Sequence, residues 1–528
     1  MIYDGNGGEP YQGDIGISKD TIAFIGDLSK VKGTVDLDAA GKAVSPGFVN
    51  MLSWAVESLI EDGRSQSDIR QGVTFEVFGE GESMGPLTPK RKEAAQKDQV
   101  IYKYNIDWNT LGEYLQSLER RGVSCNVASF IGATTVRENV IGEDDRAPTP
   151  AELDSMKAEV KLAMEEGAMG VGSSLIYPPA FFAKTDELTA LCKVASQYGG
   201  SYISHMRSEG NQFLEALEEL ITICKNANCH GEVYHLKAAG KDNWSKMDSA
   251  IHRIERARKD GLDITADMYT YLAGATGLTA CFPPSLQDGG YGKLRERLQD
   301  KKIRAQMIKE LNSNTKAWEN MYKAVGDPKN ILLLGFRQDS LRKFRGKTLA
   351  DVAKIRGTGP EETAMNLIVQ DSSRVEVAYF MMNEENVKKQ VALPWVSFGS
   401  DEGSYSPEGN FTKFTPHPRS YGNFIRVIGH YVRDEKVLSL ASAIHKLSKL
   451  PCDNLKVKRR GELKPGNYAD IVVFDPNTVT DHATFENPAQ FATGISDVFV
   501  NGTQVLKNGE HTGNKPGRFI KGPGYKFN

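Results

Sequence analysis

Hydrophobic residues recur at helical spacing in the middle of the chain, between short apolar runs. The clearest run places apolar side chains three or four residues apart, on one face of a helix, at Leu153, Met156, Val160 and Met164. Thr149 and Glu152 form a capping-box pattern around Pro150, and Gly167 is a stop signal. The pattern predicts a helix that begins at Pro150 and ends before Gly167, with a short strand at 169–172.

The alternation of helix and strand continues with a period of about 30 residues, the size of a βα unit. Further helices are predicted at 185–197 and 212–227, and strands at 201–204, 232–234 and 263–266. Repeated units of this kind predict an α/β fold, a (β/α)8 TIM-type barrel, with a doubly wound parallel sheet as the alternative. The charged, helical stretch near 283–360 is expected to be an insertion that covers the barrel mouth.

Both ends of the chain are rich in β-strand and turn signals. Strands are predicted at 15–17, 21–25, 468–474 and 497–500, with Asn501-Gly502 as a tight turn. The simplest packing is a small β-sandwich domain built from both termini, residues 1–46 and 455–528. The barrel then occupies residues 47–454.

Charge and composition narrow the function classes. The 528 residues include 65 Lys+Arg and 68 Asp+Glu, so a net charge of −3 favours neither nucleic acid nor an anionic membrane as a partner. No apolar run is long enough to span a bilayer, and six cysteines without a CxxC pattern exclude a disulfide-stapled scaffold. We expect a small-molecule partner and a cytoplasmic location. A periplasmic or secreted location is the alternative if a leader was removed, and the oligomeric state stays open.

Polar residues follow several of the predicted strands directly. His205, His235, Tyr269 and Asp401 all stand just after strand-like runs. The carboxyl ends of barrel strands are where barrel enzymes place their chemistry. Two imidazoles with one carboxylate suit a catalytic zinc that keeps an open position for water. A nearby aspartate can take the proton of that water and pass it to a leaving amine.

The chain resembles the N-acyl-D-amino-acid deacylases, or D-aminoacylases, of the amidohydrolase superfamily. The resemblance runs essentially end to end. It is strongest in Leu175-Ile-Tyr-Pro-Pro-Ala180, Tyr202-Ile-Ser-His-Met-Arg-Ser-Glu-Gly210, Tyr234-His-Leu-Lys-Ala-Ala-Gly240, Gly399-Ser-Asp401 and His417-Pro-Arg419. It implies a zinc-bearing barrel with a small β-sandwich, as the patterns above predict.

The resemblance also implies roles for individual residues. His205 and His235 match the imidazole ligands of a tightly held zinc, and Asp401 matches the catalytic aspartate. Tyr177 matches a tyrosine that polarises the substrate carbonyl. The residues that match the binding site of the substrate's α-carboxylate are Lys237, Tyr269 and Arg419. A lysine and an arginine suit an anionic amino-acid end, because arginine offers a planar fork of donors.

Two departures from the family pattern concern the metal. Most amidohydrolases have His-x-His after the first barrel strand, where this chain has Leu52 and Trp54. Neither side chain binds a metal, so a second metal site is expected to be absent. The family's cysteine ligand on the second strand is also missing, and Gly81 stands at its place. Glu80 is our preferred replacement because it is nearer the strand end and long enough to absorb a one-residue offset. Glu82 is the rival, and Glu76 is less favoured because it lies within the strand.

We therefore expect a metal-dependent hydrolase that cleaves the amide bond of N-acyl amino acids, in the D configuration by resemblance. One Zn²⁺ per chain is expected on Glu80, His205 and His235, with Mn²⁺ or Co²⁺ as alternatives since a carboxylate is harder than a thiolate. Ala275 and Thr270 replace a serine and a proline of the family's substrate site, so side-chain preference is open. The alternatives are a hydrolase of a related cyclic amide or dipeptide and a catalytically silent scaffold.

Overall fold

The computed structural model describes residues 1–39 and 41–526. Within these residues, eight parallel strands close into a barrel, with β6 and β7 forming one interrupted strand. They are β4 (Phe48–Asn50), β5 (Val73–Phe78), β6 (Asn126–Ser129) with β7 (Ile131–Gly132), β8 (Gly170–Ser174), β9 (Ser201–His205), β10 (Gly231–Val233), β11 (Ile264–Met268) and β15 (Val396–Phe398). The first and last strands meet where Met51 N donates to Phe398 O at 3.1 Å. The predicted (β/α)8 barrel is confirmed.

Helices connect the barrel strands and cover their outer side. They are α1 (Ser58–Glu61), α2 (Gln66–Ile69), α3 (Pro89–Asp98), α4 (Leu111–Arg121), α5 (Ala133–Val140), α6 (Pro150–Glu166), α7 (Thr185–Gln197), α8 (Phe213–Ala227), α9 (Lys246–Lys259), α15 (Glu384–Ala392), α16 (Arg419–Arg426), α17 (Leu440–Leu447) and α18 (Lys449–Asn454). A π-helical segment, Val427–Asp434, follows α16. Among the described residues, none of the helices has both the length and the apolar character needed to cross a bilayer.

Helix α6 illustrates how local sequence sets these elements. The Thr149 hydroxyl accepts a hydrogen bond from Glu152 N, and the Glu152 side chain accepts one from Thr149 N. Gly167 ends the helix in the left-handed region with φ +107°. Met156 and Val160 are fully buried against the barrel. The predicted helix and both of its ends are therefore present.

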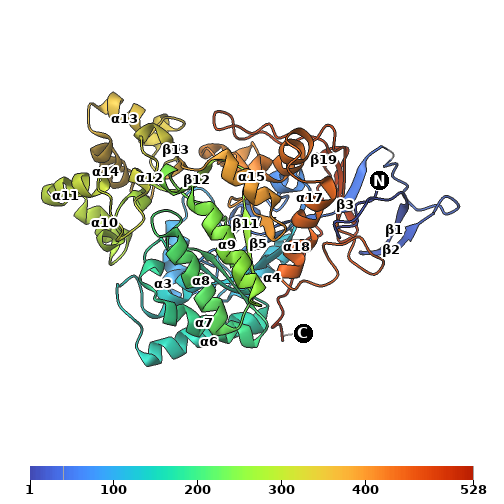
Figure 1. Ribbon diagram of the computed structural model, residues 1–528, viewed down its shortest axis with the longest axis horizontal. Helices are drawn as coiled ribbons and strands as arrows, with labels where there is room; N and C mark the ends of the chain where they lie inside the picture. The colour runs from blue at the N-terminus through green and yellow to red at the C-terminus, as the bar shows by residue number, and fades with distance from the viewer. Residues whose placement is uncertain (40, 527–528) are drawn as a thin grey trace.

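The stretch expected to be a helical insertion is larger than 283–360 and contains a sheet. Strands β12 (Ala273–Gly277), β13 (Ile331–Gly335) and β14 (Glu376–Phe380) pair antiparallel in the order β12-β14-β13. Around it lie α10 (Tyr291–Arg297), α11 (Lys301–Leu311), α12 (Met321–Ala324), α13 (Leu349–Arg356) and α14 (Pro360–Asp371). These helices project from one end of the molecule (Figure 1). Leu294, Leu333 and Val377 belong to a hydrophobic core of the insertion itself.

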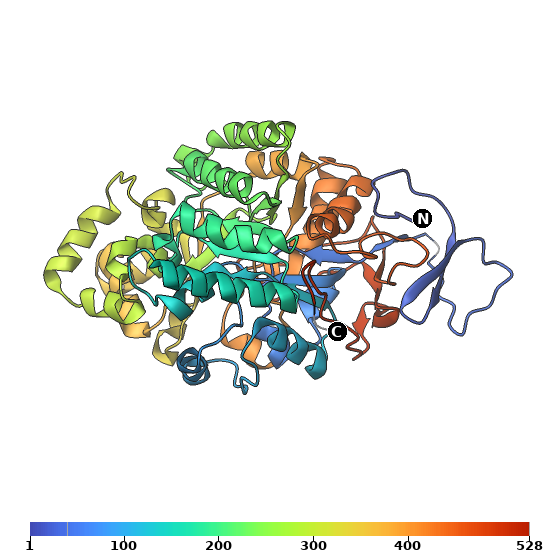
Figure 2. The same ribbon diagram turned by 90° about the horizontal axis from the view of Figure 1, so that it is seen from below.

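The two chain ends share a β-sandwich at the opposite end of the molecule (Figure 2). One sheet has the order β19-β18-β17-β16-β3, and the hairpin β1-β2 packs on it. The strands are β1 (Asp14–Ser18), β2 (Thr21–Gly26), β3 (Ala43–Pro46), β16 (Ile471–Phe474), β17 (Ile495–Val500), β18 (Thr503–Lys507) and β19 (Glu510–His511). The last described residues run under the barrel, where Val127 N donates to Arg518 O at 2.9 Å. The predicted sandwich from both termini is confirmed.

Candidate metal centre and active site

Three potential metal ligands meet at the carboxyl end of the barrel strands. His205 is the last residue of β9, His235 lies two residues beyond β10, and Glu80 lies two residues beyond β5. All three are buried and line a cavity of about 1140 Å³. The arrangement follows from the parallel barrel, which brings the ends of separate strands to one mouth.

The ligand atoms converge on a single point. Glu80 Oε1 lies 2.9 Å from His205 Nδ1 and 3.0 Å from His235 Nε2. The two rings are perpendicular, with centroids 4.5 Å apart. One ligand atom from each residue lies within 4.8 Å of the other two. Among the described residues, no other set of three His, Cys, Asp or Glu side chains converges in this way. Two imidazole nitrogens and a carboxylate oxygen are a donor set that fits zinc.

Two glycines allow Glu80 to reach this point. Gly79 and Gly81 have φ of +109° and +73°, where a side chain would be strained. A Cβ on Gly79 would lie 2.4 Å from Phe130 O, and one on Gly81 would lie 2.5 Å from Ser174 Cβ. The turn after β5 therefore passes close to the neighbouring strands, and Glu80 projects into the barrel mouth.

The other two acids considered as the third ligand are elsewhere. Glu82 lines the cavity but is exposed and outside the convergent group. Glu76 is buried within β5, where Ser53 and Ser65 hydroxyls donate to its carboxylate at 2.8 and 2.5 Å. The structure thus brings Glu80, rather than Glu82 or Glu76, to the two imidazoles.

A second acid, Glu209, supports the imidazoles from behind. Its Oε1 lies 3.0 Å from His235 Nδ1 and 2.6 Å from Lys237 Nζ. Burial and Lys237 lower the pKa of His235, but Glu209 and Glu80 outweigh them and raise it to about 10. Burial alone would raise the pKa of Glu80, yet the two imidazoles hold it below its ordinary value. The two acids therefore favour a positive charge at this point of the cavity, which a proton on His235 or a bound cation supplies.

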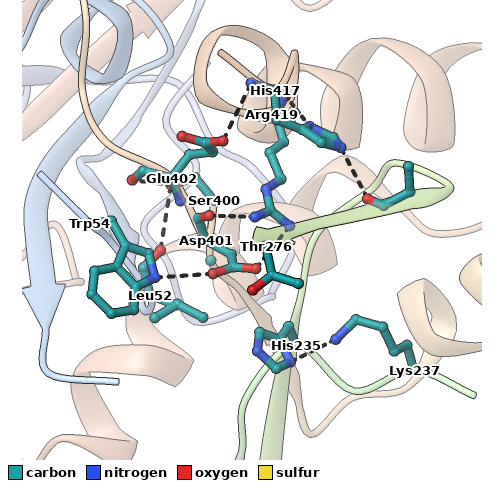
Figure 3. Close-up of polar contacts among 12 residues, drawn as sticks. Leu52, Trp54, His235, Lys237, Thr276, Ser400, Asp401, Glu402, His417 and Arg419 are labelled. Atoms are coloured by element: carbon teal, nitrogen blue, oxygen red, sulfur yellow. Dashed lines mark hydrogen bonds and ion pairs between the residues drawn. The ribbon is translucent and has the colours of Figure 1, made fainter. Parts of the chain in front are cut away.

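Asp401 lies beside the cluster, three residues beyond β15, in a strained backbone conformation with φ +53°. Its Oδ2 forms an ion pair with Arg419 Nη1 at 2.8 Å (Figure 3). Burial raises the pKa of Asp401, and Arg419 offsets part of this rise. A carboxylate held this way at the cavity wall can exchange a proton with a neighbouring group.

The indole of Trp54 lies between the carboxylates of Glu80 and Asp401. Its Nε1–H points at both carboxylates, with distances of 3.0 Å to Glu80 Oε2 and 3.2 Å to Asp401 Oδ1. Figure 3 shows the indole nitrogen facing Asp401. Leu52, the other residue at the family's His-x-His positions, is fully buried, and its carbonyl accepts a hydrogen bond from Asp401 N at 2.8 Å.

The residues expected to hold a substrate line the same cavity. Tyr177 lies against the cluster, its ring centroid 5.3 Å from that of His205. Tyr269 packs between the two basic side chains that are expected to bind the substrate. Arg419 Cζ lies 4.4 Å and Lys237 Nζ 5.5 Å from its ring centroid. Both cations already have acidic partners, Asp401 and Glu209. The Tyr269 hydroxyl, however, is buried and has no hydrogen-bond partner among the described residues.

Of the other residues considered from the sequence, some line the cavity and others are buried behind its wall. His417 is fully buried, where its Nδ1 accepts from Arg419 N at 3.1 Å and its Nε2 lies 3.0 Å from Ala273 O. It therefore supports Arg419 rather than facing the cavity. Ala275 lines the cavity, whereas Thr270 is buried and its backbone N–H donates to the Asn423 side chain at 2.8 Å.

Three residues of the site were not anticipated. Glu209 lies in a segment that resembles the family, and an acid four residues after His205 was the available signal. Glu319, from the insertion, accepts hydrogen bonds from the backbone of Glu209 and Gly210 at 2.6 and 3.3 Å. Arg374, also from the insertion, donates to Thr276 Oγ1 at 2.9 Å at the cavity wall. No local pattern marks these last two, because each reaches the site across a long sequence separation.

Comparison with known proteins identifies the family. Residues 37–506 match the model of the amidohydrolase family. The chain belongs to the amidohydrolase family. A D-aminoacylase from Alcaligenes xylosoxydans xylosoxydans is 30% identical over 520 residues, covering 98% of this chain and 96% of that protein. The predicted resemblance to the D-aminoacylases is therefore confirmed.

Solved structures of this amidohydrolase group have the same fold. A D-aminoacylase, described with one-metal activation and second-metal attenuation of a binuclear centre, superposes with a TM-score of 0.81 at 30% identity, covering 98% of each chain. The N-acyl-D-glutamate deacylase of Bordetella bronchiseptica, in complex with zinc and a phosphonate inhibitor, gives a TM-score of 0.81 at 27% identity and also covers 98% of each chain.

Proposed function

We propose that this amidohydrolase cleaves the amide bond of N-acyl amino acids, of D configuration, and releases a carboxylate and a free amino acid. The convergence of Glu80, His205 and His235 at the mouth of a large cavity is the observation that supports the proposal most strongly. The relatives named above act on substrates of this class.

Glu80, His205 and His235 would hold one divalent cation, zinc by the chemistry of the donors, with manganese or cobalt as alternatives. A cation held there would supply the Lewis acidity that activates water and polarises an amide carbonyl. Glu209 orients His235 through Nδ1, which leaves Nε2 directed at the shared Glu80 oxygen.

The residues of the chain supply the proton transfer. Asp401, with its pKa raised by burial, takes a proton from the attacking water and donates it to the leaving nitrogen. Tyr177 donates a hydrogen bond from its phenolic hydroxyl to the carbonyl oxygen as negative charge develops there. The α-carboxylate binds at the Tyr269 hydroxyl beside Lys237 and Arg419.

The identity of the substrate side chain is a separate question from the reaction. Relatives of nearly equal identity include a D-aminoacylase, whose name specifies no side chain, and an N-acyl-D-glutamate deacylase, whose substrate is acidic. Sequence identity alone therefore does not indicate which substrate side chain this protein accepts. Arg374, whose side chain is 49% exposed and lies 5.5 Å from the Tyr177 ring centroid, is a cation at this part of the cavity.

A panel of N-acetyl-D- and N-acetyl-L-amino acids, with the zinc-loaded protein, tests the proposal. We expect release of acetate from the D series and loss of turnover in Asp401→Asn with the metal retained. Unchanged hydrolysis in Asp401→Asn would remove this residue from the mechanism. Cleavage of cyclic amides or dipeptides alone would move the activity to that class. No hydrolysis of any of these by the metal-loaded protein would favour the silent scaffold, which the missing histidine pair motivates.

A further inference from the structure

Glu80 and Asp401 present one carboxylate oxygen each to the same side of the cavity. Among the described residues, Trp54 is the one that donates a hydrogen bond to both, at 3.0 and 3.2 Å. Two neighbouring carboxylates in a buried site repel each other, and Glu80 adds to the raised pKa of Asp401. A cation between such a pair would relieve this repulsion, and here an N–H group stands between them.

The backbone holds Trp54 in place. Trp54 N donates to Glu402 O at 2.9 Å, and Asp401 N donates to Leu52 O at 2.8 Å. Ser53 and Glu402 form a parallel bridge between these two segments. The strand end that bears the indole and the turn that bears Asp401 are therefore one hydrogen-bonded unit. An indole N–H is a donor only, since it has no lone pair for a metal.

We propose that Trp54 takes the place of a second cation in this site. Its N–H bridges the ligand Glu80 and the proposed general base Asp401, fixes the orientation of Asp401, and limits the centre to one metal ion. The catalytic part of this proposal rests on the proposed function, whereas the limit of one metal does not. Excess metal should therefore leave the activity of this protein unchanged, in contrast to the second-metal attenuation described for the D-aminoacylase relative.

The test is a titration of the metal-free protein with Co²⁺, followed by visible absorption and by elemental analysis after gel filtration. We expect the wild type to saturate at one equivalent. The double variant Leu52→His/Trp54→His restores two imidazoles and should take up a second equivalent; Trp54→His alone serves if the double variant does not fold. A second tightly bound equivalent in the wild type would overturn the proposal, as would one equivalent in both folded histidine variants.

The orienting role is tested with Trp54→Phe, which keeps an aromatic ring and removes the N–H. We expect one bound metal, an unchanged KM and a kcat that falls about ten- to a hundredfold, since hydrogen bonds to a charged group are lost. Trp244→Phe is the matched control, because Trp244 is also half-buried and its N–H donates to a backbone oxygen, Met381 O, at 3.0 Å. An unchanged kcat in Trp54→Phe would overturn the orienting role. A wild type that takes up one metal but hydrolyses none of the N-acyl amino acids would refute the proposed function without touching the metal limit.

Discussion

Strand β10 has a histidine at each end, and both are buried among acids. His230 precedes the strand, with Nδ1 2.9 Å from Asp263 Oδ2 and Nε2 3.6 Å from Glu232 Oε2. His235 follows it, between Glu80 and Glu209. Burial lowers the pKa of His230, but Asp263 and Glu232 raise it to about 9, close to the value of about 10 for His235.

The two ends differ in convergence and access rather than in pKa. At the mouth, a second imidazole meets the same carboxylate oxygen, and the group lines a cavity of about 1140 Å³. At the other end, His230 forms a structural ion pair and also lies 3.2 Å from Thr265 Oγ1. A histidine with a strongly raised pKa is therefore not enough to indicate a metal site. A metal site also needs ligand atoms that converge on one point and a cavity with room for a ligand.

The largest effect should separate the two histidines that flank β10. His235→Ala should lose the bound metal and lower turnover by about 10³-fold or more, because a ligand and the polarising cation are lost together. His230→Ala should keep one metal per chain. Elemental analysis of both variants, purified without added metal, measures this. Loss of metal from His230→Ala as well would erase the distinction between the two ends.

The acids behind each histidine sharpen the same comparison. Glu209→Gln should lower metal affinity by about 10–100-fold, since carboxylates that orient a ligating histidine have effects of this size. Glu232→Gln, at the partner of His230, should leave the affinity unchanged. Competition titrations against a chelator give both values. Equal affinities in wild type and Glu209→Gln would contradict a role for the Glu209 carboxylate in holding His235 for the metal.

A smaller effect is expected on stability from His230. Because its pKa is raised from 6.5 to about 9, its stabilisation is fully present below about pH 6.5 and is lost as the pH rises through about 9. Asp263 is largely exposed, so solvent screening limits the contribution to about 1–2 kcal/mol. In His230→Gln, urea unfolding between pH 6 and 10 should show a weaker decline of the unfolding free energy than in the wild type. A decline equal to that of the wild type would contradict the assignment.

The smallest effect is expected at the exposed rim of the mouth. Arg374→Ala should raise KM about threefold for an acidic substrate and leave kcat and metal content unchanged, because an exposed charge contributes little. Arg342→Ala is the control, because Arg342 belongs to the insertion, is paired with Asp339 and is not among the residues that line the cavity. A fall in kcat with KM constant would place Arg374 closer to the reacting bond than its contacts indicate.

Much of the scaffold can be predicted from the sequence, because helix caps and apolar spacing are local sequence signals. The capping box at Thr149, the glycine stop at Gly167 and the apolar spacing between them fix α6 without tertiary information. His205 and Asp401 stand out because a polar residue follows an apolar run directly. The resemblance to a family then supplied roles that spacing alone leaves open.

The remainder depends on contacts between distant segments. Strand β12, Ala273–Gly277, has no hydrophobic alternation, so it becomes a strand only by pairing with β14, about a hundred residues later. Glu209 acts on His235 because the segment after β9 folds back against β10. The sequence indicates that Trp54 offers no metal ligand, whereas its contacts with Glu80 and Asp401 can be found only when the strands are placed side by side.

The shared β-sandwich has a consequence for biosynthesis. Strand β3 lies at the start of the chain and pairs with β16 near its end, while residues 517–520 pair with Val127 and Val123 beneath the barrel. At about 5–20 residues per second, the ribosome needs tens of seconds to deliver β16 after β3 has emerged. Throughout this interval β3 has a bare edge, and such edges pair readily with other chains. Strand β3 is thus made long before it can complete its sheet, and a nascent chain that stalls before β16 should depend on chaperones more than its finished counterpart does.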